Sequence, residues 1–575
     1  MTWPMREYPL TLAIVVRRIL QQHPDRVVVD GAGRTTWGEV AERALRLMAV
    51  LRRLGVRPGD RVASFAGNSR RHLELSLAVP CLGAVLHPLN VRSAPDSVAA
   101  VVRTASDRLV FVDASLTTRF GKVRAGLAPH VRYVMFDDGE PDPDLVGGHS
   151  YEELLAGQAE PAELPELDER TAALLCHTSG TTGNPKGVLS SHRSQLLHTF
   201  GTCAADGMGV RKADTILSMV PMFHANGWGL PYAAALTGAS LVMPGSGTDP
   251  RGIVDAVVAE QVTVAAAAPM IWDGVADHLD DIEAKGDVGH LSTLRAVVIG
   301  GAAPATRLIR RYAGRGVPVL YGWGMTETSS HASLTRVPAD PTDLPERGAT
   351  QGATVLGVEV RICGDDGGEL PWDGTSVGEL EVRGPWVASG YVGVSPAEQA
   401  AGFHDGWLRT GDAATIDRCG EIRVVDRIKD LVTSHGDWIS SVELEELLTT
   451  HPAVREATVV AVPHPDWGER PVALVVTTGA AVTAGELRAH LASRVPHWWL
   501  PDGYVFCPAI PRSASGGYDK RLIRAYLRAS RPAGESYGAP SARHRLGDPG
   551  RRRAGVPPPA QRTASDPVQA APDGR

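Results

Sequence analysis

Apolar positions follow two different periods along this chain, and their alternation predicts a mixed α/β fold. Apolar residues recur at helical spacing from 40 to 51, directly after Thr36 and Glu39, which have the spacing of a capping box. We therefore expect a helix that begins after Thr36 and ends by Gly55. Between helical segments, short β-branched or apolar runs predict strands at 172–177, 215–219, 240–243, 262–267, 296–299 and 317–321.

The pattern changes after Gly378, where apolar and charged residues alternate in short segments that are typical of hairpins. A charged stretch at 426–429 then marks a predicted domain boundary. The last 45 residues contain eight Pro and eight Arg and have no apolar periodicity, so we expect them to be disordered. The predicted parts are an N-terminal domain at 1–426, a compact C-terminal domain at 427–530 and a tail at 531–575.

Composition narrows the class of protein. The chain has 575 residues with 58 basic and 65 acidic side chains and a net charge of −7, which does not fit a basic nucleic-acid-binding protein. Its apolar runs are far shorter than the roughly 20 residues of a membrane span. Six cysteines are scattered without a C-x-x-C pair, and the N-terminus does not resemble a signal peptide. We therefore expect a soluble cytoplasmic protein without a disulfide framework or zinc site. Only six of the basic residues are lysines, so each lysine in a motif is informative.

The segment 174–187 joins an apolar strand to a loop that is rich in glycine and hydroxyl groups and contains one lysine. Glycines let the backbone approach a ligand, and hydroxyls, backbone N–H groups and a lysine can donate to phosphate oxygens. The spacing is not that of a Walker A loop, because Lys186 precedes Gly187. A flexible linker is the alternative, but a linker rarely follows a core strand. The predicted phosphate-binding residues are Thr178, Ser179, Gly180, Thr181, Thr182, Gly183 and Lys186.

This loop, T-S-G-T-T-G-N-P-K-G, resembles the phosphate-binding signature of the AMP-forming adenylating enzymes, which include acyl-CoA synthetases, luciferases and adenylation domains. The resemblance extends from about Trp37 to Arg524, and its details are most similar to medium- and long-chain fatty acid–CoA ligases. It implies an α/β fold: a large N-terminal domain of α/β sheets with a β-barrel-like subdomain, and a small, mobile α+β C-terminal domain.

The segment P-M-F-H-A-N-G-W at 221–228 resembles the family's acyl-site segment, where an aromatic residue or a histidine gates access to the carboxylate. The resemblance gives this role to His224. Amino-acid-activating members have an aspartate at this position that pairs with the substrate ammonium, so an amino acid is not the expected substrate. Without the resemblance, His224 is more simply a core histidine in an apolar segment.

Two glycine-containing motifs after predicted strands resemble the family's nucleotide-contacting loops. The first, G-G-A-A-P, lies against the adenine in the family and contributes Gly301, Ala302 and Ala303. The second, Y-G-W-G-M-T-E-T, supplies an aromatic residue that stacks on the adenine in the family. The resemblance gives this role to Trp323 and adds its neighbours Gly324 and Met325 to the nucleotide site.

The same motif continues toward the phosphates. The resemblance implies that Thr326 contacts the α-phosphate and that Glu327 holds Mg²⁺. Carboxylate and phosphate oxygens are the ligands that this hard ion prefers. Outside the family context, a single T-E pair at a strand end would be weak support for a metal site.

Two later motifs resemble the family's ribose-binding and hinge segments. Asp412 ends the motif G-W-L-R-T-G-D and is expected to accept hydrogen bonds from both ribose hydroxyls. In the motif D-R-I-K-D at 426–430, Arg427 resembles a nucleotide-contacting arginine, and Lys429 occupies the hinge about which the family's C-terminal domain rotates between two reactions. Without the resemblance, this motif would be a charged linker between domains.

The motif T-S-H-G-D-W-I resembles the loop that approaches the pantetheine tunnel of CoA after that rotation. The resemblance assigns Ser434, Gly436 and Trp438 to this loop. His435 replaces the first of two glycines that the family usually has there, and glycine suits a positive φ or a close approach of the thiol.

The motif P-R-S-A-S-G-G-Y-D-K-R at 511–521 departs from the family's P-R-T-x-x-G-K-x-x-K-R. The first lysine of that pattern bridges the substrate carboxylate and the nucleotide, and here its position is Gly517. Lys520 and Arg521 match the later positions, which fixes the register. Losing such a group commonly costs about 3–4 kcal/mol of transition-state stabilisation, a factor of about 10²–10³.

The reaction implied by the resemblance is activation of a fatty acid by ATP and Mg²⁺ to an acyl-adenylate, followed by transfer to CoA with release of AMP; pyrophosphate leaves in the first step. The expected partners are a fatty acid, ATP and CoA, and a homodimer is left open. Three interpretations of Gly517 remain: a slowed ligase, an enzyme in which Lys520 or Mg²⁺ replaces the missing cation, and a non-catalytic binder of nucleotide or acyl-adenylate. Aryl and short-chain acids remain alternative substrates.

Overall fold

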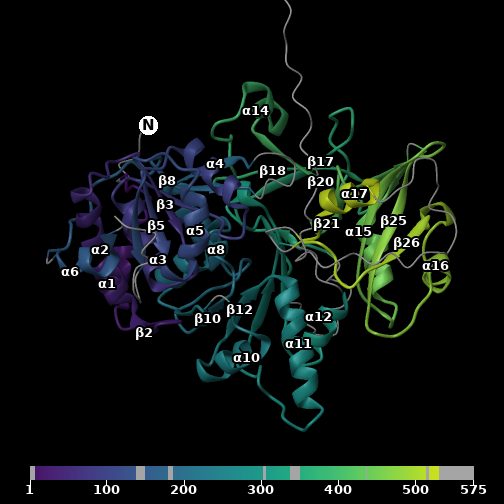
Figure 1. Ribbon diagram of the computed structural model, residues 1–575, viewed down its shortest axis with the longest axis horizontal. Helices are drawn as coiled ribbons and strands as arrows, with labels where there is room; N and C mark the ends of the chain where they lie inside the picture. The colour runs from purple at the N-terminus through teal and green to yellow at the C-terminus, as the bar shows by residue number, and fades with distance from the viewer. Residues whose placement is uncertain are drawn as a thin grey trace, which may run out of the picture.

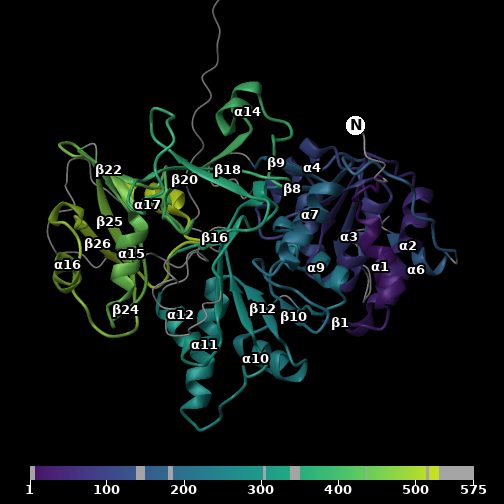
Figure 2. The same ribbon diagram turned by 180° about the vertical axis from the view of Figure 1, so that it is seen from behind.

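The computed structural model describes residues 7–136, 149–158, 160–178, 185–245, 247–301, 306–336, 350–435, 437–512 and 517–529. The predicted tail at 531–575 lies outside these ranges. Within them the strands form four sheets, two of them large and mainly parallel and two smaller and mainly antiparallel (Figure 1). Viewed from behind, helices flank the two large sheets (Figure 2). The predicted α/β fold class is therefore confirmed.

The largest sheet has nine strands. Five consecutive pairings in its centre are parallel, and antiparallel strands are added at both edges. The strands in spatial order are β16 (Ala353–Thr354), β15 (Ser333–Leu334), β14 (Val319–Trp323), β13 (Ala296–Ile299), β12 (Val264–Ala267), β10 (Thr215–Ser218), β11 (Ser240–Val242), β1 (Val27–Asp30) and β2 (Gly33–Thr36).

The second large sheet has seven strands, which are parallel except for the last pair. In spatial order they are β7 (His149–Ser150), β6 (Arg132–Phe136), β5 (Leu109–Asp113), β3 (Arg61–Phe65), β4 (Val85–Pro88), β8 (Ala172–His177) and β9 (Gly187–Ser191). Ligands of open parallel sheets bind beyond the carboxyl ends of the strands. The predicted site segments follow the carboxyl ends of β8, β10, β13 and β14.

The sequence predicted β8 and β13 with their observed bounds, but it ended β14 too early. This strand continues to Trp323 because Gly322 and Trp323 pair with Leu334 and Ser333 of β15. Trp323, expected in a loop, therefore lies on a strand, and its backbone is fixed on one side by a ladder.

The helix predicted to begin after Thr36 and end by Gly55 is present. In α2 (Trp37–Arg53) the capping box is present in both directions: Thr36 accepts from the Glu39 N–H, and Glu39 accepts from the Thr36 N–H. The other α-helices are α1 (Ala13–Gln22), α3 (Arg70–Cys81), α4 (Pro95–Ala105), α5 (Thr117–Arg124), α6 (Tyr151–Ala156), α7 (His192–Cys203), α8 (Ala225–Trp228), α9 (Leu230–Thr237), α10 (Pro250–Ala259), α11 (Pro269–Glu283), α12 (Thr306–Ala313), α14 (Pro396–Gly402), α15 (Ser441–Thr449), α16 (Ala484–Ala492) and α17 (Lys520–Ala529).

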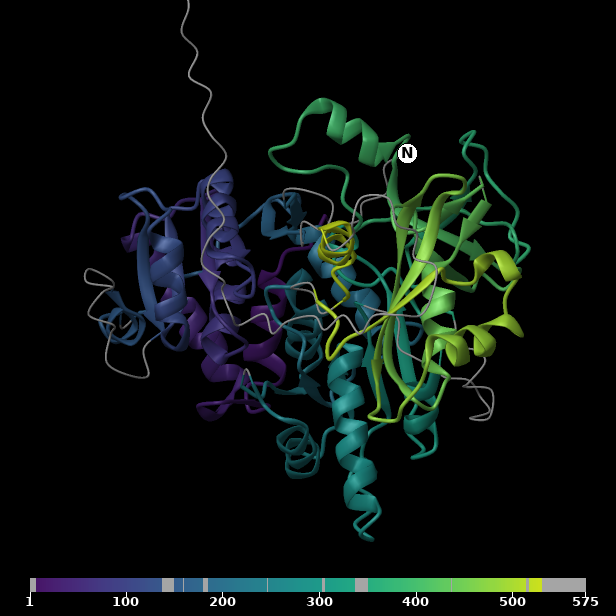
Figure 3. The same ribbon diagram turned by 45° about the vertical axis from the view of Figure 1, so that its right-hand side comes forward.

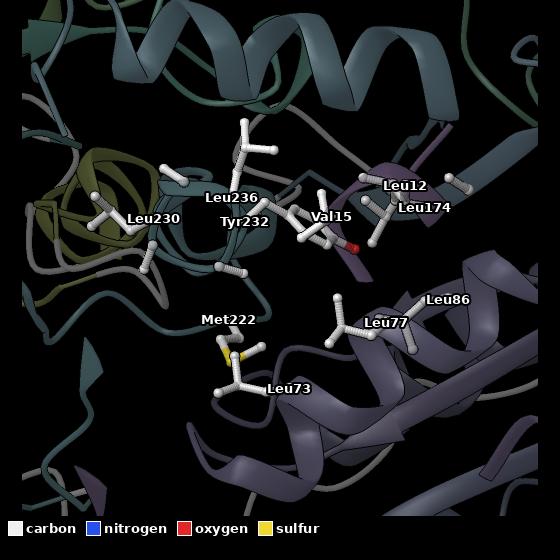
Figure 4. Close-up of a cluster of buried hydrophobic side chains, with 14 of the residues drawn as sticks. Leu12, Val15, Leu73, Leu77, Leu86, Leu174, Met222, Leu230, Tyr232 and Leu236 are labelled. Atoms are coloured by element: carbon white, nitrogen blue, oxygen red, sulfur yellow. The ribbon is translucent and has the colours of Figure 1, made fainter. Parts of the chain in front are cut away.

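A buried apolar cluster joins the two large sheets through α3 and α9 (Figure 4). Leu77 of α3 and Leu230 of α9 belong to it, together with Leu86 and Leu174 from strands β4 and β8. Burying a leucine side chain stabilises a fold by about 1.5–3 kcal/mol. Met222, from the predicted acyl-site segment, belongs to the same cluster, so this core holds that segment in place.

The third sheet contains the predicted hairpins. Its strands are β17 (Glu359–Cys363), β18 (Gly378–Arg383), β20 (Trp407–Ile416), β19 (Phe403–His404) and β21 (Ile422–Arg427). All of its pairings are antiparallel, and β20 and β21 are joined by the tight turn 417–421. This hairpin places Asp412 directly opposite Arg427.

The fourth sheet begins at Val432 and lies to one side of the others, with α15 and α17 packed on it; Figure 3 turns it toward the viewer. Its strands are β23 (Asp437–Ile439), β22 (Val432–Ser434), β25 (Gly468–Thr477), β24 (Val454–His464) and β26 (Gly503–Phe506). Among the described residues, we find no helix with the length and apolar character needed to cross a bilayer.

Candidate active site

The nucleoside-binding residues predicted from separate motifs meet around one carboxylate. The Trp323 indole N–H donates to Asp412 Oδ2 at 2.8 Å, and Arg427 Nε lies 2.6 Å from Asp412 Oδ1. Asp412 is only 2% exposed. Each carboxylate oxygen has a second lone pair, so Asp412 can still accept hydrogen bonds from a diol while both protein donors stay in place. The side chains of Asp412 and Trp323 are therefore fixed without a ligand.

Burial raises the pKa of Asp412, while Arg427 and the Trp323 indole oppose this effect. The nearby Lys429 is the predicted hinge residue, and partial desolvation lowers its pKa despite the proximity of Asp430. Arg524 of α17 donates to the Lys429 carbonyl at 3.4 Å and pairs with Asp430 at 2.6 Å. The backbone at Lys429 therefore contacts the C-terminal helix α17 in this structure.

The predicted metal-binding carboxylate, Glu327, lies on a 3₁₀ turn (Thr326–Thr328) that follows β14. It is 5% exposed, and burial raises its pKa, whereas Tyr391, Arg427 and Lys186 act in the opposite direction. The Tyr391 hydroxyl donates to Glu327 Oε1 at 2.7 Å. A single carboxylate fits a Mg²⁺ ion whose other ligands are phosphates and water. The described residues contain no cluster of three or more His, Cys, Asp or Glu side chains that could hold a metal by itself.

Lys186 lies at the end of the phosphate loop, and its ammonium stands 4.7 Å above the centre of the Tyr391 ring. The loop is closed at its base by two hydrogen bonds: Thr178 N–H donates to the Lys186 carbonyl at 2.9 Å, and Lys186 N–H donates to Thr178 Oγ1 at 3.1 Å. The predicted residues between them, Ser179, Gly180, Thr181, Thr182 and Gly183, lie outside the described residues.

The acyl-site segment contacts the adenine loop directly. A Cβ atom at Gly300 would lie 3.0 Å from Trp228 Cη2, so the indole covers this glycine. The His224 ring packs on Phe223, with ring centres 4.8 Å apart. Residues Gly301 and Trp228 both have positive φ, +81° and +59°, which shapes this junction. Ala302 and Ala303 lie outside the described residues.

A cavity of about 850 Å³ is lined in part by the predicted nucleoside-binding residues. Its lining includes the predicted residues Gly301, Trp323, Gly324, Asp412, Arg427, Trp438 and Gly517. The structure thus brings motifs from both sides of the predicted domain boundary to one space. The described residues Thr178, Lys186, His224, Met325, Thr326, Glu327, Lys429 and Ser434 lie outside this lining.

Lys520 is held away from the role of the missing lysine. Its ammonium lies 2.8 Å from Glu445 Oε1 and 2.5 Å from Ser441 Oγ, both on α15. Burial acts to lower the pKa of Lys520, but Glu445 and Asp426 outweigh it and raise the pKa. In this arrangement Lys520 is an ion-pair partner of α15, which argues against its replacing a lysine at Gly517.

The loop that contains His435 has a positive φ at this residue, which is the conformation that favours the glycine usual in the family. His435 has φ +53°, in the left-handed region, and its ring packs edge-on against Trp467 with centres 4.3 Å apart. Ser434 is buried and accepts from Arg470 at 3.3 Å, whereas Trp438 is exposed. Gly436 lies outside the described residues.

Sequence reasoning did not identify Tyr391. It lies 64 residues after Glu327. No spacing rule links the two, and a tyrosine in a loop has no periodic signal. Only the fold places its hydroxyl on the predicted metal ligand.

Comparison with known proteins agrees with this geometry. A family model described as AMP-binding enzyme matches residues 16–392, and one described as AMP-binding enzyme C-terminal domain matches 443–516. A long-chain-fatty-acid–CoA ligase of Thermus thermophilus is 42% identical over 498 residues, which cover 85% of this chain and 90% of that protein. A 3-methylmercaptopropionyl-CoA ligase of Ruegeria pomeroyi is 38% identical over 538 residues, covering 91% and 98%.

Among solved structures, an anthranilate CoA ligase, AuaEII, in complex with anthranoyl-AMP superposes with a TM-score of 0.82 at 23% identity, covering 91% of this chain and 98% of that one. At that identity the likeness concerns the fold. The predictions that the chain is an adenylating enzyme and has that fold are confirmed. The chain belongs to the AMP-binding enzyme family.

Proposed function

We propose that this chain is an acid–thiol ligase that activates a medium- or long-chain fatty acid with ATP and transfers the acyl group to CoA. The observation that carries the proposal is that Trp323 and Arg427 both contact Asp412 and that all three residues line the same cavity as Gly517. Trp323, Asp412 and Arg427 can hold a nucleoside and come from motifs far apart in sequence, and Gly517 stands where the family has the lysine that bridges carboxylate and nucleotide. The 42% sequence identity to a long-chain-fatty-acid–CoA ligase, over 90% of that protein, supports the same reaction.

The chemistry assigns a separate task to each part of the site. A carboxylate is a poor electrophile until one of its oxygens belongs to a good leaving group, here AMP. Asp412, fixed by Trp323 and Arg427, holds the ribose, and Lys186 supplies positive charge to the phosphates. Glu327 would hold Mg²⁺, which supplies charge neutralisation at the phosphates when bound. Because both Asp412 and Glu327 are already held by protein donors, binding requires little rearrangement of them.

The acyl side favours an apolar acid. Trp228 of the predicted acyl-site segment covers Gly300 with its apolar indole ring. His224 stands where an amino-acid-activating member would need an acidic partner for the ammonium group. Aryl, short-chain and thioether acids are the alternatives, since ligases for anthranilate and for 3-methylmercaptopropionate resemble this chain.

A direct assay tests the proposal. Purified protein is incubated with ATP, Mg²⁺, CoA and a series of straight-chain acids, with anthranilate and 3-methylmercaptopropionate in parallel, and AMP and acyl-CoA are measured. We expect acyl-CoA formation to be greatest with a medium- or long-chain acid. Preference for one of the other two acids would overturn the fatty-acid assignment. Nucleotide binding without AMP release would support a non-catalytic binder.

Gly517→Lys tests whether the missing cation limits the first step. We expect acid-dependent pyrophosphate release to rise by roughly 10²–10³-fold, because a lysine there would bridge the two anions that must approach each other. Gly31→Lys is the matched control, since Gly31 has open space around it and does not line the cavity. No increase in the Gly517 variant would show that this gap does not limit adenylation. A parent protein that acts only on a supplied acyl-adenylate would favour a half-reaction enzyme.

A further inference from the structure

Tyr391 contacts both charged groups on the phosphate side of the site. Its hydroxyl donates to Glu327 Oε1 at 2.7 Å, and its ring faces the Lys186 ammonium at 4.7 Å from the ring centre. Glu327 and Lys186 come from different large sheets, because Glu327 follows β14 and Lys186 precedes β9. One side chain therefore bridges the two segments.

Glu327 needs such a partner. It is 5% exposed, and a buried carboxylate needs hydrogen-bond donors in place of the water that it has lost. A hydroxyl that donates to the carboxylate stabilises the anion and fixes its rotamer. Lys186 gains from the same ring, because the face of an aromatic ring attracts a cation. The hydroxyl and the ring of Tyr391 thus serve different partners.

Tyr391 is itself held in place. Its N–H donates to Gln399 Oε1 at 3.0 Å, and its ring packs edge-on against Phe403 at 5.2 Å. The next residue, Val392, donates its N–H to the Gly187 carbonyl at 2.8 Å, directly after Lys186. The backbone next to Tyr391 is therefore hydrogen-bonded to the residue that follows Lys186.

We propose that Tyr391 is a positioning residue that holds the Glu327 carboxylate for Mg²⁺ and sets its place relative to Lys186, so that metal and phosphates bind together. The hydroxyl acts on the metal side, and the ring acts on the phosphate side. This inference rests on the proposed nucleotide-dependent function.

The two roles are separable by substitution. Tyr391→Phe keeps the ring over Lys186 and removes only the hydroxyl, whereas Tyr391→Leu removes both. Tyr312→Phe is the matched control: it removes a buried hydroxyl that donates to the Trp272 carbonyl at 2.9 Å, away from the site. Two binding measurements are made without the acid: ATP affinity in EDTA, and the Mg²⁺ concentration that gives half of the metal-dependent thermal shift at saturating ATP.

For Tyr391→Phe we expect the half-saturating Mg²⁺ concentration to rise roughly 10-fold to 100-fold, because the variant loses a hydrogen bond to a charged group. We expect its ATP affinity in EDTA to change by less than about twofold, because the ring over Lys186 remains. Tyr391→Leu should weaken both, and Tyr312→Phe neither. Equal Mg²⁺ dependence of wild type and Tyr391→Phe would overturn the inference, as would equal effects of both Tyr391 variants on ATP affinity in EDTA. Failure of the wild type to bind ATP would instead refute the proposed function.

Discussion

At the scale of single residues, the site depends on positions where a side chain has no room. Gly324, between Trp323 and the Glu327 turn, is not among the glycines with positive φ, yet a Cβ atom there would lie 1.6 Å from the Ser330 carbonyl oxygen. The obstacle is backbone, so rotation of a side chain cannot relieve it. Gly324 is therefore required for the close approach that folds the 326–331 segment back against β14.

Gly324→Ala should displace the Glu327 turn. We expect unfolding free energy to fall by about 1–3 kcal/mol, as for overpacked sites, and ATP-dependent activity to fall roughly 100-fold, because misplacement by about 1 Å commonly has that effect. Gly121→Ala is the control: this exposed helical glycine has open space around it, and alanine there should be neutral or stabilising by up to about 1 kcal/mol. Thermal melts and AMP release measure both effects, and equal behaviour of the two variants would contradict the argument.

At the scale of elements, a polar network fastens α15 and α17 to the end of β21. Asp426 Oδ2 accepts from the Ser441 N–H at 2.7 Å, and the Lys520 ammonium reaches both Ser441 and Glu445. Arg524 adds a pair with Asp430. These contacts hold α15 and α17 against residues 426–430.

Lys520→Met should destabilise the C-terminal unit by roughly 3 kcal/mol, because it leaves the charge of Glu445 uncompensated in a partly buried place. Adding Glu445→Gln to Lys520→Met should recover much of the lost stability, since the glutamine amide oxygen can still accept from Thr458 and Val459. Denaturant unfolding measures these effects. If Lys520 instead supplied the missing cation, Lys520→Met would abolish pyrophosphate release at a temperature where the variant is folded.

Elements were predictable from the sequence wherever a local pattern determines them. The α2 capping box and the bounds of β8 and β13 follow from neighbouring residues alone. β14 was ended too early because its last residues are fixed by pairing with β15, a contact across ten residues that apolar periodicity does not encode. The sequence did not point to Tyr391 for the same reason, since its hydrogen bond to Glu327 joins segments 64 residues apart.

His435 shows the limit of reading a residue type as a conformation. A histidine in place of glycine raised the question of a blocked positive φ, yet the backbone adopts φ +53°. The Trp467 ring and a hydrogen bond from the His435 N–H to the Trp467 carbonyl at 3.0 Å stabilise the strained turn. The sequence identified the special position, whereas the compensation lies on the neighbouring hairpin.

At the scale of the whole molecule, the N-terminal part encloses several histidines whose protonation burial disfavours. One of them is His177, whose Nδ1 lies 2.9 Å from His87 Nε2 at the base of the predicted phosphate loop. Burial lowers the pKa of three histidines to about 4: His72, His192 and His331. Burial, with a further contribution from His87, lowers the pKa of His177 to about 3. An unfolded histidine has a pKa near 6.5, so acid favours the unfolded chain at each of these positions.

His331→Asn isolates one of these contributions, because burial is the cause of its low pKa and it is 6% exposed. Between about pH 6.5 and 4 the unfolded chain binds a proton at this residue that the folded chain does not, so stability falls as the pH falls, by up to about 1.4 kcal/mol per pH unit. Ser330 Oγ lies 3.1 Å from His331 Nδ1, and an asparagine side chain can hydrogen-bond to the same hydroxyl, but it does not titrate. Unfolding midpoints between pH 7 and 4.5 should therefore depend less steeply on pH in His331→Asn than in the parent. Exposed His130→Asn is the control, and parallel pH profiles of His331→Asn and the parent would show that this residue does not contribute to the acid sensitivity.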